Sequence, residues 1–340
     1  MSMTQVAELV GVSQSTVSRV VNGRSFVNEV TRRRVIDAMK KVGYTPPPPD
    51  QRTGRSPKPE SRMHSGLLAV LVDPIGMHLH SVFVMRLYRA AQREANRRGY
   101  STILHFFEGR QPPPQVLERV DGFLVVGLSA SDPFPEGILS RPVVCLTSFW
   151  QKGATSILAG NDEVGRLAVE YLVERGHQRL ALLLAEAGNP SFCARGKAFQ
   201  RAARESGVKV SNFGAAVPRK TEEGVFTVEK LEAQMERLVD RFLAEQPLAS
   251  GIFCPSDAMT AICYRLLAKR GVAVGDELEF ISCDNEGSYL AGLFPRPATI
   301  DLGINERAEM AVEWLSEALK ENRDLDEVRL TVEPRIVPGS

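Results

Sequence analysis

Short apolar segments alternate with longer amphipathic segments from residue 66 to residue 337. Runs that are apolar at nearly every position are typical of strands buried on both faces, as in parallel sheets covered by helices. A first series ends near residue 160, and a second begins near Asn161. The pattern predicts an α/β body of two doubly wound parallel-sheet lobes. The predicted strands cover 66–73, 100–106, 120–127, 141–148, 179–185, 251–257, 279–285 and 329–337.

Residues 4–22, TQVAELVGVSQSTVSRVVN, carry the pattern of two short helices that meet at a tight turn. Thr4 is suited to cap the first helix, and apolar residues follow it at helical spacing. Gly11 stands where the first helix must end and the chain reverse, which a residue without Cβ does at low cost. The exposed face of the second helix carries side chains that can bond to base edges or phosphates: Gln14, Ser15, Ser18 and Arg19. This favours an all-α helix-turn-helix domain over a helical hairpin that only packs on another element.

Basic residues are concentrated near the N-terminus, although the whole chain of 340 residues has a formal net charge of only +1. Residues 1–62 hold eleven Lys and Arg against five Asp and Glu, a net of +6, and the remainder carries −5. A predicted third helix, which Asn28 can cap, contributes Arg32, Arg33, Arg34, Lys40 and Lys41. A basic N-terminal segment fits contact with phosphate, and a solvated basic surface is the plainer alternative.

The sequence contains no apolar run that could cross a bilayer, and no signal-peptide pattern follows Met1. Its five cysteines are scattered without a C-x-x-C pair, which indicates reduced thiols in a cytoplasmic protein. His78 and His80 share one long loop, 74–82, but no third ligand stands at a usual spacing, so we predict no metal site. No nucleophile-elbow, zinc-protease, Walker A or dinucleotide motif is present. We therefore expect no enzymatic activity and no cofactor.

Three stretches near the N-terminus, VAELVGVSQSTVSRVVNG, VNEVTRRRV and VGYTP, carry a family likeness. Over residues 3–46 the chain resembles the lac/galactose repressor family of transcription regulators. Most of 66–337 resembles, more loosely, the ligand-binding domain of that family, which is built like a type I periplasmic sugar-binding protein. The runs that carry this second resemblance are NDEVGRLAVEYLVERGHQRLALL and SFCARGKAFQRAARESG.

The resemblance implies three parts with different tasks. These are a DNA-binding head at 1–45, a Pro-rich linker at 46–64 and an effector-binding and dimerisation body at 65–340. Within the body we predict a first lobe of about 65–160 and 292–322, and a second lobe of about 161–291 and 323–340. The late helix and the last strand would thus return to the lobes built earlier in the chain.

The implied function is ligand-responsive transcription regulation, with repression as the usual direction. Such a regulator would bind a near-palindromic DNA operator as a homodimer. We expect no membrane among its partners. Two other classes stay open. A solute-binding protein explains the body but not the head, and an α/β enzyme with an appended helical domain rests on fold analogy alone. Steeply salt-dependent binding to duplex DNA would distinguish the regulator from both.

The resemblance also assigns roles within the head and linker. It implies that Gln14, Ser15 and Arg19 contact base edges, that Ser13, Thr16 and Asn22 hold phosphates, and that Ser18 shares their exposed face. In the family, the segment after the head folds into a short helix on DNA and inserts a leucine into the minor groove. Here prolines occupy 46–49 and no leucine occurs between Pro46 and Gly66, so we expect an extended linker. Arg52 and Arg55 would then reach the DNA backbone or a narrow minor groove.

The family binds its effector between the lobes, at the carboxyl ends of the strands. Arg195 matches the family arginine that grips ligand oxygens, and Asp284 matches an acidic residue that accepts from hydroxyls. Ser256 and Asp257 match a pair that is usually Asn-Asp, and helix capping or structural ion pairing is the alternative for each. An Arg and an Asp that face one cleft favour a sugar. The remaining candidates are Asp73 at the end of the first strand and two aromatic side chains suited to stacking, Phe83 and Phe226.

Overall fold

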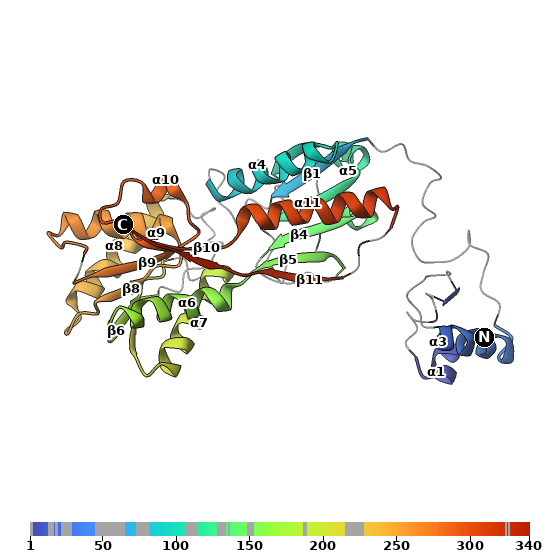
Figure 1. Cartoon of the computed structure of the whole chain (residues 1–340), viewed down its shortest axis with the longest axis horizontal. Helices are drawn as coiled ribbons and strands as arrows, with labels where there is room; N and C mark the ends of the chain where they lie inside the picture. Colours follow the sequence, from blue (N-terminus) through green and yellow to red (C-terminus); the bar gives the residue numbers. More distant parts are fainter. Residues whose placement is uncertain are drawn as a thin grey trace. The chain divides into compact units, whose positions relative to one another are not determined.

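The chain forms two compact units, Met1–Met63 and His64–Ser340. The second unit corresponds to the predicted body. Most of its helices and strands are labelled in Figure 1. The computed structural model describes residues 3–12, 17, 20–21, 29–44, 65–72, 82–106, 114–127, 134, 137–147, 153–185, 189–214, 228–275, 277–323, 325 and 327–340.

The described part of the N-terminal unit contains helices α1 (Met3–Val10) and α3 (Glu29–Lys41). Gly11 follows α1 with a φ of 71°, so the residue at the predicted reversal does adopt the left-handed conformation. The guanidinium of Arg34 donates to the carbonyl of Val10 at 2.9 Å and ties the two helices together. A small apolar core lies between them, built from Val6, Ala7, Val10, Val17, Val20, Val35 and Ala38. A core of this size gives a marginally stable unit.

The first lobe of the body, lobe A, is built on a six-stranded sheet in the order β11-β5-β4-β3-β1-β2, with every pair parallel. Alternate residues of each strand face opposite sides, so the sheet has two apolar faces. Helices α4 and α11, which lie side by side in Figure 1, pack on one face, and α5 packs on the other. The elements are β1 (Leu67–Val72), α4 (Val82–Arg97), β2 (Ser101–Phe106), α5 (Pro114–Arg119), β3 (Gly122–Val126), a 3-10 turn (Ile138–Ser140), β4 (Val143–Thr147), β5 (Thr155–Ala159), α11 (Ile304–Lys320) and β11 (Arg329–Val332).

The second lobe, lobe B, has a six-stranded sheet in the order β12-β10-β9-β8-β6-β7. Only the edge strand β12 is antiparallel to its neighbour. Helices α6 and α7 contact each other as one pair, and α8 and α9 form the other. The elements are α6 (Asn161–Glu174), β6 (Arg179–Leu182), α7 (Pro190–Glu205), β7 (Lys209–Asn212), α8 (Val228–Ala244), β8 (Gly251–Phe253), α9 (Asp257–Lys269), β9 (Glu279–Cys283), α10 (Gly287–Leu290), β10 (Ala298–Asp301) and β12 (Arg335–Val337).

The predicted fold class is confirmed, but the two late lobe boundaries need correction. We assigned 292–322 to the first lobe and 323–340 to the second. The structure instead pairs β10 with β9 in lobe B, and pairs β11 with β5 in lobe A. Both strands have four residues, too few to show which sheet they join. Among the described elements beyond residue 292, α11 and β12 lie in the lobes that we predicted for them. The single strand predicted at 329–337 is in fact two strands, β11 and β12, which belong to different sheets.

The chain therefore passes between the lobes three times, at residues 160, 302–303 and 333–334. Residues 332–334 approach both of the other crossovers. A Cβ added to Gly160 would lie 2.9 Å from the Cδ of Pro334. Gly303 has a φ of 61°, and its added Cβ would lie 2.6 Å from the Cγ1 of Val332. The crossovers are thus packed at a spacing that only glycine permits at two positions.

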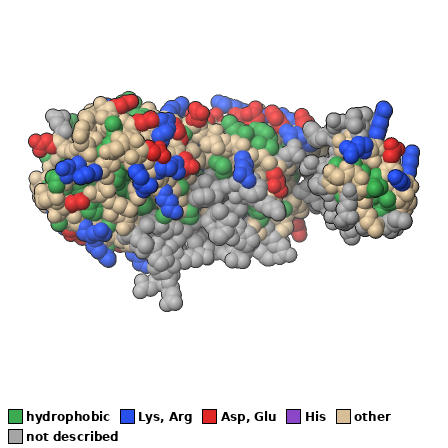
Figure 2. All heavy atoms as spheres, turned by 90° about the horizontal axis from the view of Figure 1, so that it is seen from below, with side chains coloured by type: hydrophobic (Ala, Val, Ile, Leu, Met, Phe, Trp, Pro, Cys, Tyr) green, Lys and Arg blue, Asp and Glu red, His purple; other side chains and the backbone are tan. Residues whose placement is uncertain are grey.

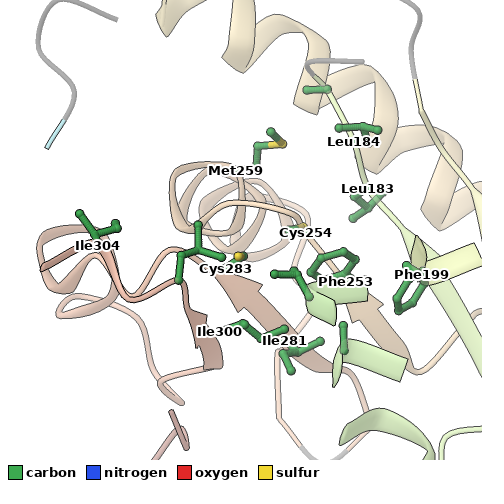
Figure 3. Packing of buried hydrophobic residues seen from close by; sticks show 14 of the residues in the cluster. Leu183, Leu184, Phe199, Phe253, Cys254, Met259, Ile281, Cys283, Ile300 and Ile304 are labelled. Carbon is green, nitrogen blue, oxygen red and sulfur yellow. The ribbon is translucent and has the colours of Figure 1, made fainter. Parts of the chain in front are cut away.

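Lobe B has a dense aromatic and aliphatic core. Phe253 on β8 and Phe199 on α7 are both fully buried, with ring centroids 5.0 Å apart. Figure 3 shows their rings facing each other, with Ile281 and Cys254 nearby. All five cysteines lie within described residues and are free thiols, four of them buried and Cys193 partly exposed.

Surface charges of both signs are interspersed over the face of the body that Figure 2 shows. This mixture agrees with the small net charge of the residues beyond the basic N-terminal segment. Among the described helices, none has the length and apolar character that would let it span a membrane.

Helices α6 and α7 cross closely at Gly165. A Cβ at this position would overlap the backbone nitrogen of Phe199 and lie 2.5 Å from the Cβ of Ala198. Gly165→Ala should therefore lower the free energy of unfolding by about 1–3 kcal/mol in urea titrations, because overpacking outweighs alanine's better helix propensity. Gly275→Ala is the control, since nothing lies within 4 Å of its added Cβ, and it should change stability by less than about 0.5 kcal/mol. Equal stability of the two variants would contradict the close crossing.

Candidate effector site

The site is built around the turn that follows strand β9. Asp284 and Asn285 have φ values of 105° and 51°, which residues with side chains rarely adopt. Hydrogen bonds from the neighbouring strand β10 hold this strained backbone. The Asp284 amide donates to the carbonyl of Ile300 at 2.9 Å, and the Asn285 amide donates to the hydroxyl of Thr299 at 3.2 Å. A strained backbone conformation that is held in place by several surrounding contacts is typical of functional sites.

Arg195 reaches this turn from helix α7. The helix begins at Pro190, and the side chain of Asn189 caps it by accepting from the amide of Ser191 at 3.0 Å. The guanidinium is 4% exposed and donates to Asn161 Oδ1 at 3.0 Å, to the Pro255 carbonyl at 2.6 Å and to Asp284 Oδ1 at 3.0 Å. A buried Arg–carboxylate pair with additional hydrogen bonds holds the guanidinium donors in a fixed position.

Ser256 and Asp257 stand at the start of helix α9. The Ser256 hydroxyl caps the helix by accepting from the Met259 amide at 3.3 Å. Asp257 is fully buried, and its two carboxylate oxygens accept from the Glu286 amide at 2.6 Å and the Thr299 hydroxyl at 2.8 Å. Ser256 thus has the capping contact that the structural alternative describes, while Asp257 holds the backbone of the turn at Glu286. Direct contact of either residue with an effector stays a prediction.

Arg86 brings lobe A to the same turn. It lies on α4 and donates from Nη1 to the carbonyls of Asp284 at 3.1 Å and Asn285 at 2.8 Å. Its Nη2 lies 3.7 Å from Asp301 Oδ1 at the end of β10. The side chain thus bridges the lobes beside the Arg195–Asp284 pair.

Three carboxyl groups share this region and disfavour ionisation of one another. Burial raises the pKa of Asp257 to about 7, and the charge of Asp284 adds to that effect. Burial also raises the pKa of Asp284, against the opposing effect of Arg195. Burial raises the pKa of Glu286 to about 8, with further contributions from Asp284 and Asp257. Perturbed carboxyls gathered at the carboxyl edge of a parallel sheet make this region the candidate binding site.

The structure brings together four of the predicted effector residues: Arg195, Ser256, Asp257 and Asp284. Phe83 lies in the first turn of α4 and packs, partly buried, against the main core. Asp73 and Phe226 lie outside the described residues. The sequence reasoning missed Asn161, Arg86 and Glu286. Asn161 does begin the run NDEVG, on which the family resemblance rests, and that was the one available signal.

The predicted DNA contacts all lie outside the described part of the chain. They are Ser13, Gln14, Ser15, Thr16, Ser18, Arg19, Asn22, Arg52 and Arg55. The described helices α1 and α3 flank the stretch that holds the first seven of them.

The fold and this site define a two-lobed ligand-binding body of the periplasmic-binding-protein type, joined to a helical DNA-binding head. Two family models match the chain accordingly. The model of bacterial regulatory proteins of the lacI family matches residues 2–47, and that of the periplasmic binding protein-like domain matches residues 169–340, half of the chain. The protein belongs to the LacI family of bacterial regulatory proteins.

Relatives and solved structures agree with this assignment. The chain is 27% identical to the HTH-type transcriptional repressor PurR of Vibrio atlanticus, covering 100% of this chain and 98% of the relative. It is 24% identical to PurR of Pasteurella multocida, covering 84% and 82%. The structure of the transcriptional regulator CelR in complex with cellobiose matches with a TM-score of 0.62 and 22% identity, covering 100% of this chain and 99% of that one. A LacI-type regulator from Alkaliphilus metalliredigens with D-xylulofuranose matches with a TM-score of 0.63 and 21% identity, covering 80% and 98%.

Proposed function

We propose that this protein is a ligand-responsive transcriptional repressor, whose body binds a small effector and thereby changes the affinity of the head for its operator. The observation that carries the proposal is the Arg195–Asp284 pair on the strained turn after β9. Arg86 from the other lobe contacts the same turn, so an effector bound there would act on both lobes. A ligand that binds one arrangement of the lobes better than another shifts the equilibrium between them.

A carbohydrate effector is the form of this proposal that the site chemistry supports best. Arg195 offers donors and Asp284 offers acceptors, which is the combination that vicinal hydroxyls need. In this proposal Phe83 and Phe226 stack on the apolar face of a sugar ring. CelR was solved with cellobiose and the Alkaliphilus regulator with D-xylulofuranose, while the curated relatives are named PurR.

The same proposal assigns a task to each part of the chain. The head at 1–45 reads the operator, the linker at 46–64 lies extended with Arg52 and Arg55 on the DNA, and the body at 65–340 binds the effector. A single head makes few base contacts, so two heads on one near-palindromic operator require a homodimer. We assign dimerisation to the first lobe, through α4 and its neighbours, and the cytoplasm as the place of action.

Duplex binding tests the DNA half of the proposal. Sites selected from a randomised duplex pool should bind the full chain with an affinity that falls steeply as salt is raised, because cationic side chains displace counterions from phosphates. Arg19→Ala should cost about 1–3 kcal/mol on the selected site and relax its sequence preference. The control is Arg201→Ala in the body, where the side chain is exposed and pairs only with Asp162 among the described residues. Unchanged discrimination between selected and scrambled duplex in the Arg19 variant would contradict this assignment.

The effector half is tested in the same assay. Addition of the true effector should change the affinity for the selected site, and Arg195→Ala should remove that response while leaving salt-dependent duplex binding in place. The two properties are separable because Arg195 lies in the body unit and the head belongs to the other unit.

A further inference from the structure

Glu286 is a buried carboxyl side chain at the centre of the site whose bonding is incomplete. The residue is 6% exposed, and its backbone amide donates to Asp257 Oδ2 at 2.6 Å. Its carboxyl group has neither a hydrogen bond nor an ion pair among the residues that the structure describes. Neither oxygen belongs to the described side-chain atoms that are both fully buried and unpaired, so the carboxyl keeps some access to solvent and its acceptors are available to a ligand.

The neighbours of Glu286 place its carboxyl in the effector site. Asp284, Asp257, Arg86 and Arg195 all act electrostatically on its ionisation. Both arginines already donate to other acceptors. Arg195 donates to Asp284, Asn161 and a backbone carbonyl, and Arg86 donates to two backbone carbonyls of the turn. Two cations therefore lie near Glu286, but their described hydrogen bonds go to other acceptors.

We propose that Glu286 contacts the effector and selects a neutral or cationic ligand rich in hydroxyl or amine donors, against phosphorylated and carboxylated analogues. This inference rests on the proposed function, since it concerns the same site. A carboxyl group accepts two or more hydrogen bonds from hydroxyls or an ammonium group. A phosphate or carboxylate at the same place would face three carboxyls, those of Asp257, Asp284 and Glu286, and would be repelled by each of them that is ionised.

Binding measurements on the full chain test the inference. The probes are D-glucose, D-galactose, D-ribose, cellobiose, D-glucosamine, glucose 6-phosphate, D-gluconate, guanine and hypoxanthine, screened by thermal shift and titrated by calorimetry. We expect the strongest probe to be a neutral sugar or the amino sugar. Glu286→Ala should weaken its binding about 10- to 100-fold, as for the loss of a hydrogen bond to an ionisable group. Glu286→Gln should retain part of the affinity, because an amide keeps one acceptor oxygen.

Glu174→Ala is the matched control, since Glu174 lies exposed at the end of α6. Its affinity for the probe should equal that of the wild type. Wild-type affinity of Glu286→Ala, or strongest binding by glucose 6-phosphate or gluconate, would overturn the inference. In that case loss of binding in Arg195→Ala would still support the proposed function. Failure of every probe to stabilise the wild-type chain would count against both.

A measurement without ligand checks the incomplete bonding itself. The pKa of Glu286 is raised from 4.5 to about 8 in the folded chain, so the folded state holds a proton that the unfolded state has lost in this range. The free energy of unfolding should therefore fall as the pH rises from about 4.5 to 8, and Glu286→Gln should flatten that slope. An unchanged slope in the variant would show that Glu286 is already paired and would overturn the inference. The charged or titratable groups that face it are Asp257, Asp284, Tyr289, Arg86 and Arg195.

Discussion

Arg195→Ala should lower the free energy of unfolding of the body by about 3–5 kcal/mol and abolish effector binding. The truncation leaves the carboxylate of Asp284 buried without its cation, and it leaves Asn161 Oδ1 and the Pro255 carbonyl without their donor. Removal of one partner of a buried ion pair is far more costly than the net contribution of the pair itself. Chemical denaturation of the full chain, followed by circular dichroism, measures the loss.

Two companion variants make this prediction specific. Arg201→Ala removes an exposed arginine from the same helix, whose partner Asp162 is also exposed, and should cost less than about 1 kcal/mol. The double variant Arg195→Ala with Asp284→Asn removes both charges and should recover part of the lost stability. If the double variant is no more stable than Arg195→Ala alone, the buried pair is not the origin of the effect.

Phe253→Ala should lower the free energy of unfolding by about 3–5 kcal/mol, since it deletes a fully buried ring from the central strand β8. Its ring packs against Phe199, and the two link the sheet of lobe B to helix α7 (Figure 3). A cavity between a strand and a helix collapses poorly, because both backbones are held by hydrogen bonds. Equilibrium urea unfolding at constant pH is the measurement.

Phe294→Ala is the control for this loss. Phe294 is 92% exposed, so its truncation should change stability by less than about 0.5 kcal/mol. A loss below 2 kcal/mol for Phe253→Ala would mean that the core of lobe B repacks around the cavity more freely than this packing suggests.

Most of the body could be predicted from the sequence because its central strands have a recognisable, continuously apolar pattern. Segments such as 67–72 and 122–126 are apolar throughout, as burial on both faces requires. Strand β7, KVSN, was not predicted. It lies at the edge of its sheet, is partly exposed and contains polar residues, so it lacks the apolar pattern. Strands β5 and β10 were not predicted either. The residues of β10 and β11 were placed in the wrong lobes because the pairing of a short strand is decided by neighbours distant in sequence.

The candidate effector site was likewise predictable in part. Arg195 and Asp284 were found because each stands in a recognisable stretch of sequence. Their mutual contact, across 89 positions, was not derivable from the chain order. Arg86 lies 198 positions from Asp284 on a helix whose pattern indicates only amphipathicity. Glu286 was missed for a similar reason, since only the fold shows that this carboxyl is buried and unmatched among the described residues.

The three closely spaced crossovers between the lobes have a mechanical consequence. Three short connections at one place resist sliding and separation of the lobes, and they leave rotation about that place as the easiest motion. A rotation displaces each atom in proportion to its distance from the axis. A closure of a few tenths of an ångström beside Gly160, Gly303 and Pro334 would therefore become a larger displacement at the distant ends of both lobes. We expect the body to work as a lever, with ligand binding energy applied near the fulcrum and movement delivered at its far ends.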